Sequence, residues 1–185
     1  MPRFIVLTPI FLIASLLGYP AAADGLWRSE YGITHGSKVI LHMPLTIGAR
    51  NYQVFIQSGE VKNDKPSSYN LSYDQFNPFC YFEIRASSDQ TQTISPDVFE
   101  ITRVTVDETE IVLSRSIQVA QLFNLADIPS NIVEVLILEL RSETQVNVKQ
   151  LVCADGFADP SQVVMPTLKQ IKDTLGQVAT LKIAR

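Results

Sequence analysis

Two acidic pairs are the residues whose types and spacing come nearest to those of a catalytic site. Asp89 with Asp97, and Glu108 with Glu110, each supply the two carboxylates that glycoside hydrolysis requires. Both pairs fall in predicted turns and strand ends, where acidic residues are common on any soluble protein. We therefore expect no catalytic residue among them. A small carboxylate-dependent hydrolase or cell-wall-modifying enzyme is the alternative function.

The two histidines lack the spacing of a metal site. His35 falls in the loop Gly32–Gly36 and His42 on the first predicted strand, with no Cys-His or His-His spacing typical of metal ligands. A G-x-S-x-G turn of serine hydrolases is missing from the sequence, and so is a glycine-rich loop that cradles phosphate. The sequence therefore predicts no metal and no cofactor.

The first residues have the layout of a cleavable secretory signal. Arg3 supplies a positive charge, Phe4–Leu17 is mostly apolar, and Ala21–Ala23 places small residues before Asp24. An apolar run of about 14 residues is shorter than the about 20 that span a bilayer. We expect residues 1–23 to be removed and residues 24–185 to work in the periplasm or outside the cell as one domain, with no integral membrane segment.

The two cysteines, Cys80 and Cys153, both lie in the expected mature chain. An even pair in an exported chain forms a disulfide more often than it stays as two free thiols. A catalytic or metal-binding role is the alternative, but a C-x-x-C spacing and a neighbouring histidine are both missing. We predict a disulfide between Cys80 and Cys153.

Charge limits the kinds of partner. The chain has 15 Lys and Arg against 19 Asp and Glu, a formal net charge of −4, and its basic residues are scattered singly. Phosphate-rich partners need clustered Lys and Arg. The sequence therefore argues against nucleic acid or an anionic membrane surface as the main partner.

Aromatic residues gather in and just after a polar stretch. Lys62–Pro78 has the composition of a long surface loop and carries Tyr69, Tyr73 and Phe76. Exposed aromatic side chains give a large contact area at modest entropic cost. These three are our candidate contact residues for a protein or glycan partner. The alternative is that they cover the end of a β-structure.

Alternation of apolar and polar residues predicts a mainly β chain. Cys80, Phe82 and Ile84 are expected on one buried face of the clearest strand. Asp107-Glu108 is expected to be a turn, and Val119–Ser130 a loop with a possible helical turn. The other predicted strands are Lys38–Met43, Asn51–Gln57 turning at Ser58-Gly59 into 60–62, Val98–Val106, Glu110–Ser114, Ile132–Arg141 and Val146–Cys153.

A helical period occurs only near the C-terminus. Leu168, Ile171 and Leu175 recur at helical spacing, with Pro166 suited to the first turn and Gly176 to the end. Residues 178–183 are either a short strand or a frayed tail. The predicted fold is a single-domain β-sandwich or open barrel of six to eight strands with one amphipathic helix near 166–176.

Four segments resemble a group of small, uncharacterised exported proteins of Gram-negative bacteria. They are Ile56–Gly59, Phe76–Glu83, Leu151–Cys153 and the helix within Thr167–Leu181. The resemblance covers most of the mature chain. It implies a periplasmic address and a pairing of the two cysteines, and it implies no activity.

Together these features predict a non-enzymatic binding module of the periplasm or the extracellular space. We expect it to contact a partner protein, a cell-envelope component or a small ligand through loops at one end of the β-structure.

Overall fold

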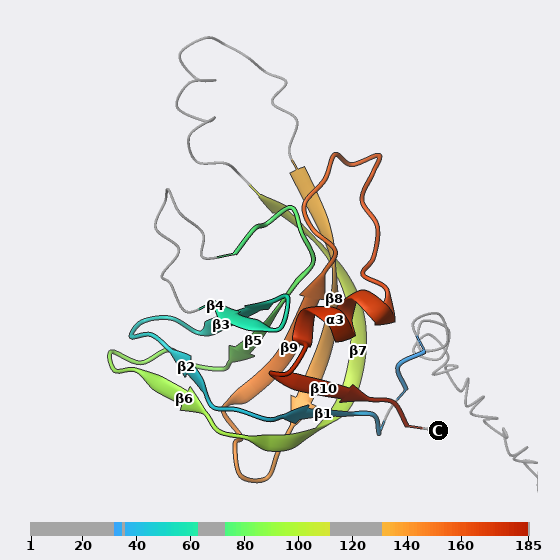
Figure 1. The fold of residues 1–185 in the computed structure, drawn as a ribbon. Helices are drawn as coiled ribbons and strands as arrows, with labels where there is room; N and C mark the ends of the chain where they lie inside the picture. Colours follow the sequence, from blue (N-terminus) through green and yellow to red (C-terminus); the bar gives the residue numbers. More distant parts are fainter. Residues whose placement is uncertain (1–31, 35, 63–72, 112–130, 185) are drawn as a thin grey trace, which may run out of the picture.

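The computed structural model describes residues 32–34, 36–62, 73–111 and 131–184 (Figure 1). The predicted signal segment 1–23 and the predicted loop 119–130 lie outside these ranges.

Eight strands form one curled antiparallel sheet, a half-barrel, and two short strands form a second sheet (Figure 1). The large sheet has the order β10, β1, β7, β8, β9, β5, β3, β4, and the small sheet pairs β2 with β6. The mainly β prediction is confirmed. The strands are β1 (Lys38–Leu41), β2 (Leu45–Ile47), β3 (Gln53–Gln57), β4 (Glu60–Lys62), β5 (Phe79–Ile84), β6 (Gln92–Ile94), β7 (Asp97–Ile111), β8 (Asn131–Arg141), β9 (Val148–Ala154) and β10 (Ala179–Lys182).

The inner face of the half-barrel encloses the main hydrophobic core. Side chains of a strand alternate between two faces, so every second residue of β5 points inward, and Cys80, Phe82 and Ile84 are all buried as predicted. Phe82 contacts Phe99 of β7 with their ring centroids 6.1 Å apart. The core therefore joins strands that are separated by β8 and β9 in the sheet.

The single described helix, α3 (Leu168–Leu175), covers the open side of the half-barrel, where it contacts β3, β5 and β10 (Figure 1). Its Ile171 and Leu175 are buried in the core. The expected start at Pro166 is wrong because Thr167 is the N-cap, whose hydroxyl accepts a hydrogen bond from Gln170 N at 3.2 Å. Gly176 ends the helix as predicted.

The predicted break between two strands at Asp107-Glu108 is also wrong. β7 continues through both residues, which face Val135 and Glu134 of β8 in the ladder. Both side chains are exposed, so this part of β7 needs no apolar residue on either face. Its sequence is therefore polar, as in a turn, although the segment is a strand. The short strands β2 and β6 were not predicted. The tail 178–183 contains a strand, β10, which pairs with β1.

The predicted disulfide is confirmed. Cys80 and Cys153 face each other on the neighbouring strands β5 and β9, with their Cα atoms 4.1 Å apart. Both residues are about 1% exposed. The bridge therefore joins two central strands from within the core.

Candidate binding surface

The outer face of the sheet carries a second, smaller apolar cluster. β9 is buried on both faces, so Leu151 and Cys153 belong to the inner core while Val152 and Ala154 belong to the outer cluster. The other buried members of the outer cluster are Phe79, Val133, Val135 and Phe157. Both faces of the middle of the sheet are therefore covered by side chains.

Three partly buried aromatic residues, Phe55 on β3, Tyr81 on β5 and Tyr73 just before β5, extend this cluster around Phe79. Tyr73 stacks on Phe55 with ring centroids 4.3 Å apart and contacts Phe79 at 4.8 Å. Phe55 also contacts Tyr81 at 5.1 Å. Offset and tilted aromatic contacts of this kind add to the free energy gained from burial. We call Phe55, Tyr73, Phe79 and Tyr81 the aromatic strip.

The two phenols of the strip stay neutral at physiological pH. Burial raises the pKa of Tyr73 above its usual value. Burial raises the pKa of Tyr81 further, and the neighbouring Glu83 carboxylate adds to that effect. The strip therefore offers uncharged rings.

The turn Tyr73–Pro78 is tied to the sheet by one buried glutamine. Gln57, 7% exposed, donates from Nε2 to the carbonyl oxygens of Asp74 at 2.8 Å, Asn77 at 3.3 Å and Pro78 at 3.2 Å. Its Oε1 accepts from Asp74 N at 2.9 Å. The Asp74 carboxylate closes the turn by accepting from Phe76 N at 3.0 Å and from Asn77 Nδ2 at 2.6 Å. These bonds fix the backbone of the turn.

A close backbone approach holds the other side of this turn. Phe157 N donates to Gln75 O at 2.9 Å. Gly156 has φ +143°, and a Cβ added to it would lie 2.7 Å from Phe76 O. Only glycine fits this position without displacing the turn.

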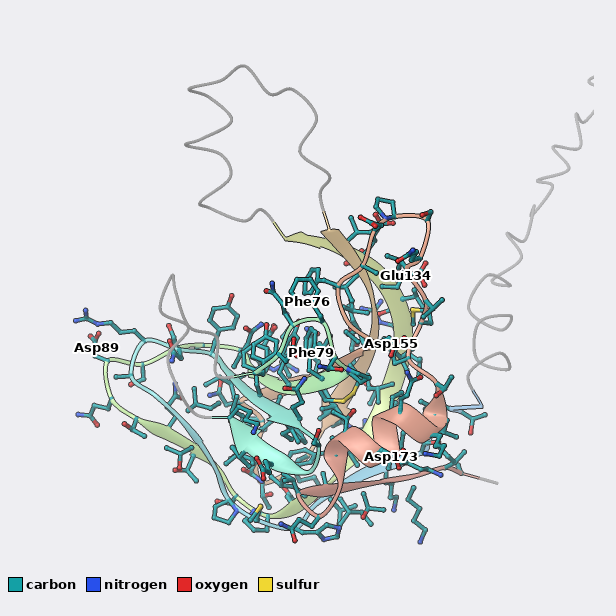
Figure 2. The ribbon with its side chains drawn as sticks, turned by 45° about the horizontal axis from the view of Figure 1, so that its top comes forward. Phe76, Phe79, Asp89, Glu134, Asp155 and Asp173 are labelled. Atoms are coloured by element: carbon teal, nitrogen blue, oxygen red, sulfur yellow. A yellow bond between two sulfur atoms is a disulfide. The ribbon has the colours of Figure 1, made fainter. Side chains whose placement is uncertain are left out.

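The three predicted contact residues differ in their exposure and in their neighbours. Phe76 is 55% exposed on the fixed turn (Figure 2). Tyr73 is partly buried, with its ring stacked on Phe55, so it supports the turn. Tyr69 lies outside the described residues. The sequence analysis missed the supporting roles of Gln57 and Gly156; the turn-forming sequence Asp74–Pro78 was the available signal that this segment is ordered.

A polar hollow of about 600 Å³ lies between this turn and α3. Asn77 and Pro78 line it on one side and Gln170 and Asp173 on the other. The Gln170 amide also donates to the Asp155 carboxylate. Burial raises the pKa of that carboxylate above its usual range. The hollow thus places amide and carboxylate groups next to the exposed Phe76 turn.

The candidate catalytic carboxylates do not converge. Asp89 accepts a hydrogen bond from Arg50 Nε at 3.0 Å on an exposed turn. Asp97, its candidate partner, lies at the start of β7 and instead accepts a hydrogen bond from Ser142 Oγ at 2.6 Å. Glu108 is exposed on β7, and the side chain of Glu110 lies outside the described part of the chain.

The histidines are also apart. His42 Nε2 lies 2.7 Å from Thr180 Oγ1 at the exposed side of β10, and His35 is outside the described residues. Within residues 32–34, 36–62, 73–111 and 131–184, no group of three or more His, Cys, Asp or Glu could hold a metal ion.

No family model, curated protein or solved structure matches this chain. The resemblance to exported bacterial proteins stays a prediction. In the described part of the chain, no helix has both the length and the apolar character needed to cross a membrane. What the geometry offers is a turn with a fixed backbone and one exposed aromatic side chain, Phe76.

Proposed function

We propose that this chain is a non-enzymatic binding module of the periplasm or the extracellular space. Its contact surface is the Tyr73–Pro78 turn with Phe76 at the centre, and its partner is a protein or another component of the cell envelope. The observation that carries this proposal is the exposure of Phe76, 55%, on a turn whose backbone is fixed by Gln57.

A fixed turn favours binding because little conformational entropy is lost when a partner arrives. The aromatic strip supports the turn from below through Tyr73, and Gly156 supports it from the side. The polar hollow beside Asn77 supplies hydrogen-bonding groups around the apolar contact. An apolar centre with a polar surround is the usual organisation of a protein interface.

The test compares two variants in affinity isolation of the protein from its native envelope under mild crosslinking. Phe76→Ala should weaken capture of the partner about tenfold or more, as expected for a central aromatic contact. Val164→Ala is the matched control, since Val164 is also 55% exposed but lies between β9 and α3. It should leave capture unchanged.

Two results would contradict the proposal. Partners captured equally by wild type and Phe76→Ala would remove the turn as the contact surface. Equal losses in both variants would show that general surface hydrophobicity, rather than this turn, causes capture.

A further inference from the structure

The strands β8 and β9 separate before the turn that joins them. Their ladder ends where Glu139 faces Gln150, although β8 continues to Arg141 and β9 begins at Val148. β9 stays with β5 instead, where Arg85 N donates to Asn147 O at 2.8 Å. The separation leaves a cleft of about 310 Å³, which we call the hairpin cleft.

The lining of the hairpin cleft is cationic, although the chain as a whole carries a net charge of −4. Arg85, Arg141 and Lys149 line it, against the single carboxylate of Glu139. A concentration of one charge sign in a concave site raises the local concentration of ligands of the opposite sign. The cleft therefore favours an anion.

Two of the three cations already have carboxylate partners. Arg141 donates to Glu100 at 2.6 Å, and Lys149 lies 2.7 Å from Glu83. Among the described residues no carboxylate pairs with Arg85. Arg85 is thus the cation available to a ligand.

The guanidinium of Arg85 is oriented by the protein. Its Nε donates to Val146 O at 3.1 Å, which fixes the plane of the group and leaves the two terminal nitrogens for other acceptors. Two parallel N–H groups match the two oxygens of a carboxylate. Leu140 and Val148 add aliphatic lining, and Val146 at the rim is 72% exposed. This combination suits a carboxylate on an aliphatic body.

The cleft continues into a neighbouring hollow. Arg85 and Lys149 line both, and the second also includes Tyr52 and Glu83. The combined groove crosses β8, β9 and β5, which are neighbours in the sheet, and reaches Tyr52 just before β3. At about 4.8 Å between strands it is about 14 Å long, the length of about four extended residues.

We infer that this groove binds an extended acidic peptide segment of the partner, with a Glu or Asp carboxylate held by Arg85 in the hairpin cleft. The inference rests on the proposed function and names the chemistry of its partner. The length of the groove, about four extended residues, favours a peptide over a free organic acid. The single unpaired cation among the described residues of the cleft and its aliphatic lining favour a monoanionic carboxylate on an apolar body over a phosphate.

The test is a titration followed by NMR of ¹⁵N-labelled full-length protein. The first probe is a blocked pentapeptide with glutamate at its centre between two leucines, and the second replaces that glutamate with glutamine. The glutamate peptide should shift the signals of Arg85 Nε–H and the Val146 amide saturably. The glutamine peptide should bind about tenfold more weakly because it lacks the charge.

Two substitutions of Arg85 separate charge from geometry. Arg85→Gln removes both the charge and the two parallel N–H groups, and Arg85→Lys keeps the charge but removes those groups. Each substitution should weaken binding of the glutamate peptide about tenfold. Lys38→Gln is the matched control. It makes the same charge change as Arg85→Gln on an exposed β1 residue outside the groove, and it should change binding by less than about twofold. Unchanged amide signals of β5 core residues would verify folding of each variant.

Several outcomes would overturn the inference. No saturable shift with the glutamate peptide, or equal binding of the two peptides, would remove the carboxylate site. An equal loss in Lys38→Gln would reduce the effect to general charge attraction. Inorganic phosphate binding more tightly than the peptide would make this an oxyanion site of another kind, and glutarate binding as tightly would make the ligand a free acid.

Failure of this inference can be told from failure of the proposed function. If Arg85→Gln still captures the envelope partner while Phe76→Ala does not, the turn is the contact surface and the groove plays no part. If Phe76→Ala still captures the partner but Arg85→Gln loses the peptide, the groove binds and the turn does not.

Discussion

Gln57 and Asp74 are joined by two hydrogen bonds that run in opposite directions. Asp74 N donates to Gln57 Oε1 at 2.9 Å, and Gln57 Nε2 donates to Asp74 O at 2.8 Å. A glutamine side chain can make both bonds because its amide carries an acceptor and two donors. The end of β3 thereby holds a turn whose Asp74 lies 17 residues further along the chain.

Gln57→Glu should therefore destabilise the protein. The new carboxylate would face the carbonyl oxygens of Asp74, Asn77 and Pro78 without a proton to donate. We expect the free energy of unfolding at pH 7 to fall by about 2–3 kcal/mol, measured by urea unfolding. Gln90→Glu, the same change on an exposed turn residue, should alter it by less than about 0.5 kcal/mol. Similar effects of the two substitutions would contradict a role for Gln57 in holding the turn.

The disulfide should act as one link that two residues share. It closes a loop with a sequence separation of 73, for which the chain-entropy estimate is about 4 kcal/mol. Cys80→Ala and Cys153→Ala should each lower the free energy of unfolding by about that amount, and the double variant should lose little more. Urea unfolding of the three variants and of reduced wild type would measure this. Additive losses would show that the two cysteines contribute separately.

Gly156→Ala should displace the Tyr73–Pro78 turn. The added Cβ would meet Phe76 O at 2.7 Å from a backbone at φ +143°, so we expect a loss of about 2 kcal/mol or more and weaker partner capture. Gly32→Ala separates backbone strain from the steric contact, since Gly32 has φ +64° but nothing within 4 Å of an added Cβ. It should cost only about 1 kcal/mol and leave capture unchanged. Normal capture by Gly156→Ala would mean that the turn need not keep this position.

Much of the fold could be predicted from local patterns of apolar and polar residues. The alternation of Cys80, Phe82 and Ile84 predicts the inner face of β5, and the spacing of Ile171 and Leu175 predicts the buried side of α3, because both periods are set by backbone geometry. The same reasoning fails for β7 at Asp107-Glu108, where both faces are exposed and no alternation is required.

The candidate surface was harder to predict because its residues are distinguished by distant contacts. Tyr73 and Phe76 look alike in the sequence, yet Tyr73 is partly buried by stacking on Phe55 of β3 while Phe76 is exposed. The hairpin cleft depends on where the ladder of β8 and β9 ends, and residue types alone do not fix that register.

Asp97 should make the stability of the protein depend on pH in the acid range. Desolvation raises the pKa of Asp97, but hydrogen bonds from Ser142, Thr144, Gln145 and the Val98 amide outweigh it and lower the pKa to about 2 from 3.8. A lowered pKa means that the folded state favours the carboxylate. Its contribution is therefore complete above about pH 5 and is lost as the pH falls through 3.8 towards 2.

Asp97→Asn tests this contribution. Because Asp97 is only partly buried and solvent still screens its charge, we expect the variant to be less stable by only about 1 kcal/mol above pH 5, and the difference from wild type to shrink between pH 4 and 2. Urea midpoints measured from pH 2 to 7 would show it. Ser142→Ala keeps the carboxylate but removes its 2.6 Å hydrogen bond, so it should raise the pKa of Asp97 and move the acid loss to higher pH. A constant difference between wild type and Asp97→Asn at every pH would show that the Asp97 carboxylate does not hold the β8–β9 turn through its charge.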